Sequence, residues 1–374
     1  MSSDKHIIRN FLARNIVIIL FVIISAVAIP FSKYSGTYLV QEVTTRLGRD
    51  AFLVLSLLLP VMAGMGINFG IALGAFSGQI ALIFVTGMQV PGAAGIFLAM
   101  LISTPLSILA GWMAGAILNR AKGREMITSL ILGFFMTGVY QFIVIICMGG
   151  IIPVPDPNHT LVLSKGFGIR NAIQLTLTKG SFDYFFDRLT HASIGLFGIH
   201  IPFFTFIVIA VLCALTIWFR KTKLGQDMRA IGQDMGVSAT AGINVDKTRI
   251  IAMTISTVLA GYGQLIAVQN IGTLNTYAGG DMIALYAAAA LLVGGATVNK
   301  AGIPNVIIGT GLFHLMFVVM PLASNNLFGS AIIGEYSRTF VSYAVVSASL
   351  VLHAWNRARD KELERISMRA SNAR

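Results

Sequence analysis

Residues 93–118 read AAGIFLAMLISTPLSILAGWMAGAIL, a run of 26 residues that contains no charged side chain. A helix of about 20 apolar residues is long enough to cross the roughly 30 Å hydrocarbon core of a bilayer. This stretch therefore predicts a helix that spans a membrane.

Similar apolar segments recur along the chain, and together with 93–118 they make ten. The others are 16–32, 51–67, 76–90, 127–147, 201–219, 250–268, 282–297, 304–320 and 339–355. Hydrophobic residues make up 56% of the chain and charged residues only 11%, whereas soluble domains carry about 25% charged residues. We predict an all-α integral membrane protein with one transmembrane domain of about ten helices, and we exclude a soluble enzyme.

Glycines interrupt the sequence between the second and third predicted spans. Gly64, Gly66, Gly70, Gly74 and Gly78 fall within fifteen residues. Glycine-rich backbone at membrane depth is tolerated where it is buried in protein or lines a cavity. The helices are therefore expected to break here.

The distribution of lysine and arginine predicts the orientation of the chain. With ten spans and a cytoplasmic N-terminus, 19 of the 27 basic residues lie inside, including those in the loop 220–249 and in the basic tail 356–374. This excess matches the positive-inside rule. Both termini are thus expected in the cytoplasm, with 148–200 as an external loop, and the net charge of +12 reflects topology and not nucleic-acid binding.

The first apolar segment allows a second interpretation. Lys5, Arg9 and Arg14 precede it, and Ala26-Val27-Ala28 fits the cleavage site of a signal peptide. We favour retention of the segment, because the basic region is long for a signal peptide and Pro30 follows the site closely.

The order of the spans suggests an internal repeat. Spans two to five cover about 51–147, and spans seven to ten cover about 250–355. The first group starts outside and the second inside, which is the arrangement of an inverted repeat.

The sequence predicts no catalytic residue and no metal site. It contains neither a G-x-x-x-x-G-K-[ST] phosphate loop nor an H-E-x-x-H motif. The centres of the ten predicted spans hold no acidic residue, lysine or arginine, and His314 is the one histidine in mid-span, where we interpret it as a neutral, hydrogen-bonded residue. The energy for any transport is therefore expected to come from a partner, or the flow is passive.

Uncharged polar and aromatic residues in and beside the spans are the candidates for solute binding. Amides and aromatic faces can hold a neutral polar ring compound without burying a charge, although amides between helices also serve as packing contacts. The candidates for the substrate pathway are Asn68, Phe69, Gln79, Phe134, Phe135, Tyr140, Gln141, Gln264 and Asn270.

The cytoplasmic loop 220–249 carries the most specific pattern. It reads RKTKLGQDMRAIGQDMGVSATAGINVDKTR, and two short helices are predicted in it, at 224–231 and 235–241, separated by Gly232 and Gly236.

This loop resembles the coupling loop in the permease subunits of bacterial ABC importers, in the branch that serves ribose, other simple sugars, nucleosides and branched-chain amino acids. A second match lies in Val258-Leu259-Ala260-Gly261-Tyr262-Gly263 and in the alanine-rich run 287–296, which contains Gly294-Gly295. The residues that would couple to the ATPase are Gly225, Asp227, Arg229, Ala230, Gly232, Asp234, Ala239 and Gly242.

The resemblance implies partners that this chain does not contain. An ATPase dimer would bind the ATP, a solute-binding lipoprotein would deliver the substrate, and a second permease, either a copy or a paralogue, would complete the pathway. The resemblance places the chain in the bacterial inner membrane and implies that it has no cofactor of its own.

The stretch GINFGIALGAFSGQIAL, residues 66–82, departs from the pattern of ribose-type members. A simple sugar or a nucleoside is still the expected solute, and a riboflavin-like vitamin or a branched-chain amino acid is the alternative. A secondary carrier or passive channel is the competing class, followed by a membrane-embedded enzyme.

Overall fold

The computed structural model describes residues 16–175, 203–280, 282–297 and 300–330, together with shorter pieces. These pieces are 195–196, 199–200, 332–337, 339–340, 343–344, 347–348 and 351. Several predictions fall outside the described residues, namely the basic residues before Ile16, much of the external loop and of the tenth span, and the basic tail 356–374.

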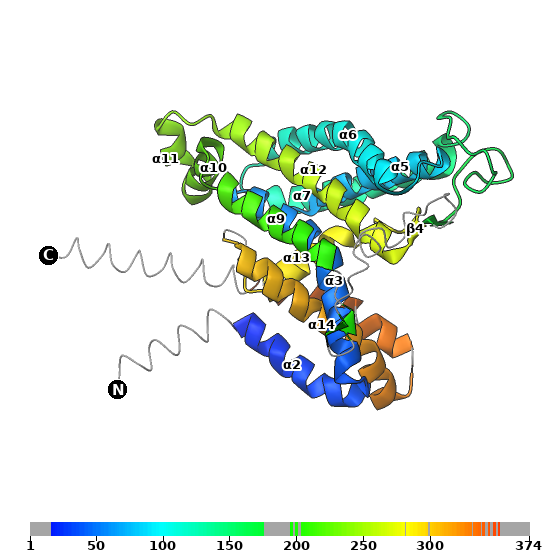
Figure 1. Ribbon diagram of the computed structural model, residues 1–374. Coiled ribbons are helices and arrows are strands. Elements are labelled where there is room, and N and C mark those ends of the chain that lie inside the picture. The colour runs from blue at the N-terminus through cyan, green and yellow to red at the C-terminus, as the bar shows by residue number, and fades with distance from the viewer. Residues whose placement is uncertain are drawn as a thin grey trace, which may run out of the picture.

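The described part of the chain is mostly helical (Figure 1). Its α-helices are α2 (Ile16–Ser32), α3 (Gly36–Ser56), α4 (Leu58–Met62), α5 (Ala72–Gly87), α6 (Gly92–Arg120), α7 (Glu125–Phe142), α9 (Phe203–Phe219), α10 (Lys223–Gln233), α11 (Met235–Thr240), α12 (Val245–Ile271), α13 (Ile283–Val293) and α14 (Ile303–Phe328). The 3-10 helix η1 (Phe69–Ile71) precedes α5, and the π-helical turn η2 (Ile143–Cys147) follows α7. The short strands are β1 (Ala172–Gln174), β2 (Gly195–Leu196), β3 (Ile199–His200) and β4 (Thr273–Asn275).

Five helical segments are long and apolar enough to cross a membrane within the described residues, and α9 makes a sixth if it is counted with α10, from which it is bent by 76°. The five run over 69–87, 92–120, 125–147, 245–271 and 303–328. The apolar helices α2 and α13 are shorter. A helical membrane protein is thus supported, whereas the ten-span count is not confirmed.

The predicted span 51–67 is wrong. Helix α3 begins at Gly36, in the stretch assigned to an outer loop, and ends at Ser56; α4 follows for five residues, and 63–68 is not helical. Helix α3 carries its charged residues between Glu42 and Asp50, and the hydropathy of the sequence made this half look extramembrane. The structure pairs these charges, so the helix continues without a break from the polar half into the apolar one.

The glycines after η1 form a packing surface, and the helix α5 is unbroken through Gly74 and Gly78. A Cβ atom on Gly74 would lie 2.1 Å from the carbonyl oxygen of Thr257, and one on Gly78 would lie 2.7 Å from that of Gly261. Small residues in membrane helices allow backbones to approach this closely. Helix α12 thus packs directly on α5.

Helix α6 meets the same helix α12 with a second stripe of small residues. Ser103, Ser107, Gly111 and Gly115 lie four residues apart, and a Cβ atom on Gly111 would lie 2.7 Å from the Cα atom of Thr254. Since α12 is enclosed on both sides, most of its C-terminal half is buried.

Two groups of helices make up the described molecule, as Figure 1 shows. One contains α5, α6, α7 and α12, and the other contains α2, α13 and α14. Helix α3 contacts both α12 and α14 and so joins the groups. The second half of α3 is buried from Ala51 to Ser56, at the centre of the protein.

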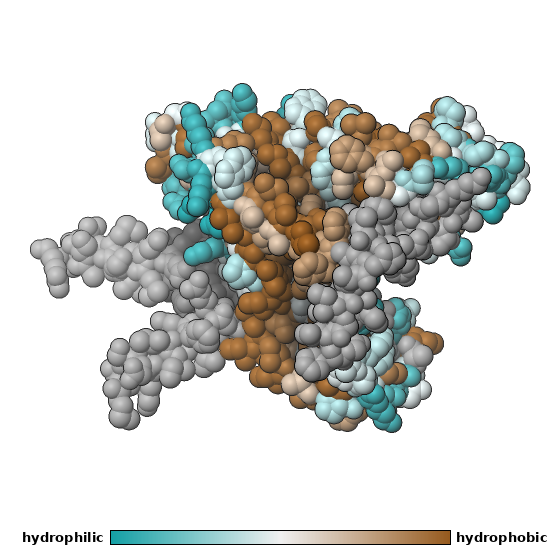
Figure 2. Space-filling view, in the orientation of Figure 1, coloured by the Kyte–Doolittle hydropathy of each residue, from teal (hydrophilic) through white to brown (hydrophobic). Residues whose placement is uncertain are grey.

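The two ends of the molecule are polar and the belt between them is apolar (Figure 2). One end carries α10 and α11, and we call it the α10 end. The other carries the described loop 148–175, and we call it the loop end. Large exposed apolar side chains such as Phe97, Leu101 and Trp112 lie between them on α6, as expected for a surface that faces lipid.

The loop end is folded and held to the helices. Strand β1 pairs antiparallel with β4, with Ile173 opposite Leu274. The hydroxyl of Tyr277 donates to the carbonyl of Ile169 at 2.7 Å, and that of Thr276 donates to Arg170 at 2.6 Å. A Cβ atom on Gly87 would lie 2.0 Å from the Pro155 carbonyl oxygen, so the loop packs directly on the end of α5.

Candidate functional site

A largely apolar cavity of about 490 Å³ lies between η1, α7 and the start of α13. We call it the apolar cavity. Phe69 and Phe134, two of the predicted pathway residues, line it together with Leu130, Thr137 and Leu285. Phe134 is 66% exposed, so the cavity is open at the side of the protein.

Asn68 fixes the position of Phe69 at the cavity wall. Its Oδ1 accepts a hydrogen bond from the Gly70 amide at 2.8 Å and caps η1. Its Nδ2 lies 2.9 Å from the sulfur of Met253, and the Phe69 amide donates to Ser129 at 3.2 Å. Asn68 is 1% exposed and does not line the apolar cavity, so its role in this structure is to support Phe69.

A second cavity, of about 190 Å³, lies between α3, α12, α13 and α14. We call it the polar cavity. Gln264 is the predicted pathway residue that lines it, and the Gln264 Nε2 lies 3.5 Å from the Gly279 carbonyl oxygen. Gln79 is fully buried close to Gly279, and its amide makes no hydrogen bond among the described residues.

The four remaining predicted pathway residues lie apart from one another. Phe135 is 66% exposed on α7, and Tyr140 is buried in a stack with Phe76, with ring centroids 4.5 Å apart. Gln141 donates from Nε2 to the Tyr277 carbonyl at 3.1 Å and so ties α7 to the loop end. Asn270 is buried in the last turn of α12.

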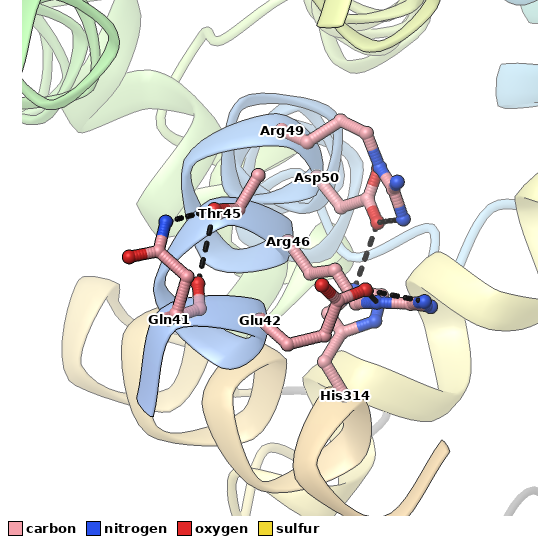
Figure 3. Close-up of polar contacts among 7 residues, drawn as sticks. All are labelled: Gln41, Glu42, Thr45, Arg46, Arg49, Asp50 and His314. Atoms are coloured by element: carbon pink, nitrogen blue, oxygen red, sulfur yellow. Dashed lines mark hydrogen bonds and ion pairs between the residues drawn. The ribbon is translucent and has the colours of Figure 1, made fainter. Parts of the chain in front are cut away.

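Charged residues that the sequence analysis missed line the polar cavity (Figure 3). The carboxylate of Asp50 accepts from Arg49 Nε at 3.2 Å and from Arg49 Nη2 at 3.1 Å. The same carboxylate lies 2.9 Å from His314 Nε2. His314 is the twelfth residue of α14, near its middle, so an acidic side chain from α3 reaches the middle of a predicted span.

The charges are arranged along one face of α3. Glu42 pairs with Arg46 at 2.7 Å one turn before Asp50, and the Arg46 guanidinium lies 5.8 Å from the ring centroid of Phe317. The sequence pattern that could have indicated this charged cluster is the spacing of four residues between Glu42, Arg46 and Asp50, which places them on one helical face. His314 is hydrogen-bonded, as expected, although its partner was not foreseen.

The predicted coupling loop folds into two short helices at the α10 end, with the break at Asp234 instead of at the glycines. Thr222 caps α10 through the Gly225 amide, and the Asp234 Oδ1 caps α11 through the Val237 amide at 2.9 Å. Buried Met228 and Ile231 anchor α10 to the helices.

Glycine brings α10 into backbone contact with the segment before η1. A Cβ atom on Gly232 would lie 2.3 Å from the carbonyl oxygen of Met62, and one on Gly64 would lie 3.1 Å from the Cα atom of Gly232. Gly64 has a φ of +70°, a conformation in which residues with a side chain are strained. Four residues after Gly64, Asn68 begins the turn that holds Phe69 in the apolar cavity.

The other coupling candidates divide between buried and exposed positions. Gly225 packs against Phe219, where a Cβ atom would lie 2.1 Å from the carbonyl oxygen. Asp227 and Ala230 are half-buried. The exposed candidates are Arg229, Asp234, Ala239 and Gly242.

A buried ion pair stands next to these helices. Arg249, at the start of α12, is fully buried and pairs with Glu125 at the start of α7. On the surface nearby, Lys122 lies 2.5 Å from Asp246. The pairs fix the starts of α7 and α12 to each other.

Asp156 organises the loop at the other end. Although burial alone would raise its pKa, hydrogen bonds from the backbone amides of Val162, Thr160 and Leu161 to its carboxylate hold the pKa below the ordinary value.

Long apolar helices around two cavities, with an exposed helix pair at one polar end, indicate an α-helical integral membrane protein. Comparison with known families identifies it further. Residues 39–352 match the family described as branched-chain amino acid transport system / permease component, and the chain belongs to this family. The resemblance deduced from the loop 220–249 is thereby confirmed.

Curated relatives are permeases with different cargoes. The chain is 26% identical to the autoinducer 2 import system permease protein LsrD of Photorhabdus luminescens, over 78% of this chain and 77% of that protein. It is 26% identical to the nucleoside ABC transporter permease protein NupB of Lactococcus lactis subsp. cremoris, over 44% and 43%. It is 31% identical to the xylose transport system permease protein XylH of Haemophilus influenzae, over 41% and 38%. No solved structure matches the chain.

Proposed function

We propose that this chain is the permease subunit of an ATP-driven importer in the bacterial inner membrane and forms the pathway for a neutral polar solute. A separate ATPase dimer binds and hydrolyses the ATP, a solute-binding protein delivers the solute, and a second permease completes the pathway. The chain itself has no catalytic role and needs no cofactor.

One observation carries the proposal: α10 touches the segment 62–64 through glycine backbone, and this segment leads within a few residues to Phe69. A partner that binds the exposed side of α10 and α11, including Arg229 and Asp234, can therefore displace the wall of the apolar cavity. Rigid-body movement of packed helices is an established way to transmit such a displacement.

The ten-helix topology belongs to this proposal. Helices α2, α3, α5, α6, α7, α9, α12, α13 and α14, followed by a segment that includes the described helical residues 332–337, would supply the ten crossings. In this arrangement the α10 end faces the cytoplasm, both termini lie there, and the four crossings α3, α5, α6 and α7 form an inverted repeat with the four crossings that begin at α12. Arg220, Lys221, Lys223 and Arg229 near α10 support this orientation by the positive-inside rule.

A simple sugar or a nucleoside is the solute we favour. Two of the relatives are named for xylose and for nucleosides, which are neutral polar ring compounds. The aromatic residues Phe69 and Phe134 in the apolar cavity suit the face of such a ring. A branched-chain amino acid is the alternative that the family description suggests, and a vitamin such as riboflavin is a further one.

Substitution of Gly232 tests the proposed coupling. The Gly232→Ala side chain collides with the Met62 carbonyl oxygen, so we expect solute uptake per ATP hydrolysed to fall at least tenfold in proteoliposomes that contain the complete transporter. Gly236→Ala is the matched control, because a Cβ atom there meets only the Asp234 side chain at 3.2 Å. Equal uptake per ATP in both variants and the wild type would contradict the coupling.

The Asp50–His314 pair is the observation that favours a different class, a carrier driven by protons. Titratable groups at membrane depth are typical of such carriers. This candidate predicts uptake by the chain without any ATPase, driven by a pH gradient alone, and it fails if uptake requires ATP at every gradient.

A further inference from the structure

The polar cavity has an unusual lining for the interior of a helix bundle. Arg49 and Asp50 come from α3, Gln264 from α12, Tyr286 from α13, and His314 from α14. Charged and polar groups at membrane depth are costly to keep, so a cluster of them that opens on a cavity is expected to have a function. The match with the permease family assigns no role to these residues.

The charges of the cluster balance within it. Arg49 uses Nε and Nη2 to bind both oxygens of Asp50, and His314 Nε2 adds a third contact to the same carboxylate. Both oxygens of the carboxylate are therefore engaged by its own neighbours, and the guanidinium is neutralised. A cavity built in this way offers no excess charge to an anion or a cation.

Hydrogen-bonding capacity is nevertheless left over. The Nδ1 atom of His314 is buried without a hydrogen-bond partner among the described residues. With Nε2 turned to Asp50, Nδ1 is left to make a hydrogen bond of its own, as an acceptor in the imidazole or as a donor in the imidazolium. The Arg49 Nη1 group remains as a donor, and the Oε1 of Gln264 is an acceptor, since the amide uses only Nε2 for a long contact with Gly279.

A hydroxyl group meets both requirements, because it donates and accepts at the same time. Tyr286 and Phe317 also line the cavity and lie edge to face, with ring centroids 5.2 Å apart, beside aliphatic side chains such as Leu53 and Ile283. Hydroxyl-binding groups together with apolar rings suit a sugar, whose ring has a polar rim and apolar C–H faces.

The volume of the polar cavity limits the size of the solute that can bind there. Its volume of about 190 Å³ equals the share of about six water molecules in the liquid and is below the roughly 300 Å³ at which pockets for drug-sized ligands begin. It accommodates a monosaccharide better than a nucleoside.

We infer that the polar cavity is a subsite for a neutral monosaccharide, held by Arg49, Gln264 and His314 against Tyr286 and Phe317. The inference rests on the proposed transport function and specifies its solute. In this subsite the first half of the chain binds the solute through Arg49 of α3, and not through the glycine-rich stretch 64–78.

Direct binding to the full chain in lipid nanodiscs tests this subsite. The probes are D-xylose, D-ribose, adenosine and L-leucine, and the measurement is the dissociation constant by ligand-observed NMR. Gln264→Leu removes the amide at similar volume. We expect it to weaken binding of the two pentoses about tenfold, the effect of one lost hydrogen bond.

Gln269→Leu is the matched control, because Gln269 is a buried amide of the same helix that does not line the polar cavity. The subsite is supported if the pentoses bind the wild type and the Gln269→Leu protein but bind the Gln264→Leu protein about tenfold more weakly. It is overturned if the pentoses do not bind the wild type, if both variants weaken equally, or if L-leucine binds more tightly than either pentose.

ATP-driven uptake by the complete transporter, measured on the same variants, separates this inference from the proposed function. If uptake persists and the preference for pentose over leucine is the same in Gln264→Leu as in the wild type, the subsite is wrong and the permease function stands. If the wild type shows no ATP-driven uptake of any solute, the proposed function is wrong.

Discussion

Arg249 and Glu125 meet where α12 and α7 begin, in an interior that excludes water from the arginine completely. A buried charge is tolerated when a partner neutralises it, and it becomes costly when that partner is removed. Neither residue lines the apolar or the polar cavity, so we assign them to the stability of the α10 end.

Glu125→Gln removes one charge of this pair and leaves Arg249 buried without a counterion. We expect a loss of about 3–5 kcal/mol, the usual cost of breaking a buried pair on one side. The measurement is the thermal unfolding midpoint in nanodiscs. The double variant Glu125→Gln with Arg249→Met should recover most of the loss, and a single variant as stable as the wild type would refute the role of the pair.

Asp156 makes the loop end sensitive to acid. Because its pKa in the folded protein is below that in the unfolded chain, it stabilises the loop at pH values above the ordinary carboxyl pKa of about 3.9, and this contribution is lost as the pH falls through the folded pKa. Hydrogen exchange of the amides of Leu161 and Val162 should accelerate below about pH 4, after correction for the intrinsic rate. In Asp156→Asn the same amides should be weakly protected at every pH, and unchanged protection would count against this role.

At the scale of the elements, α12 packs between α5 and α6 through glycine and serine, whose side chains are absent or small. Gly74 and Gly78 on α5 face it from one side, and Ser103, Ser107 and Gly111 on α6 face it from the other. The contact of backbone with backbone explains why glycine accumulates here without breaking α5.

Gly74→Ala inserts a methyl group 2.1 Å from the Thr257 carbonyl oxygen. Overpacking of this kind costs about 1–3 kcal/mol, so we expect a lower unfolding midpoint. Gly138→Ala on α7 is the control, since a Cβ atom there meets nothing within 4 Å, and it should unfold at or slightly above the wild-type temperature. If both variants unfold at the same temperature, the packing account of the glycines is wrong.

The apolar helices were predictable from the sequence, because runs such as 93–118 and 304–320 have no alternative to a membrane or a large core. The helix pair of the loop 220–249 was also predictable within a few residues. Helix α3 was not predictable, because a hydropathy average takes no account of ion pairs. It counts Arg49 and Asp50 as polar, although Asp50 neutralises Arg49 and also contacts His314, 264 positions later in the chain. For the same reason the sequence suggested Phe69 and Gln264 for the two cavities but could not suggest Arg49.

At the scale of the whole molecule, the two polar ends have different characters. The α10 end exposes Arg229, Lys247 and a small apolar patch at Val237, which is 66% exposed. The loop end is built from short strands and capped turns. The proposed importer requires this asymmetry, because the ATPase and the solute-binding protein are proposed to bind opposite ends.

Labelling of single cysteines, after replacement of Cys147 and Cys213, tests the orientation. Ala239→Cys lies on the exposed face at the α10 end and Lys165→Cys lies on the loop end. In intact cells stripped of their outer membrane, a membrane-impermeant maleimide should modify the Lys165→Cys protein and spare the Ala239→Cys protein until the cells are opened. The reverse pattern would show that the proposed topology is inverted.

The central claim, that this chain conducts solute under the control of a separate ATPase, is tested most directly by uptake of radiolabelled D-xylose into proteoliposomes. The chain is reconstituted with and without the ATPase, its second permease and the solute-binding protein. The account predicts uptake that requires ATP and the ATPase, and that falls to background when either is left out. Uptake at the full rate by this chain alone, without ATP, would contradict it.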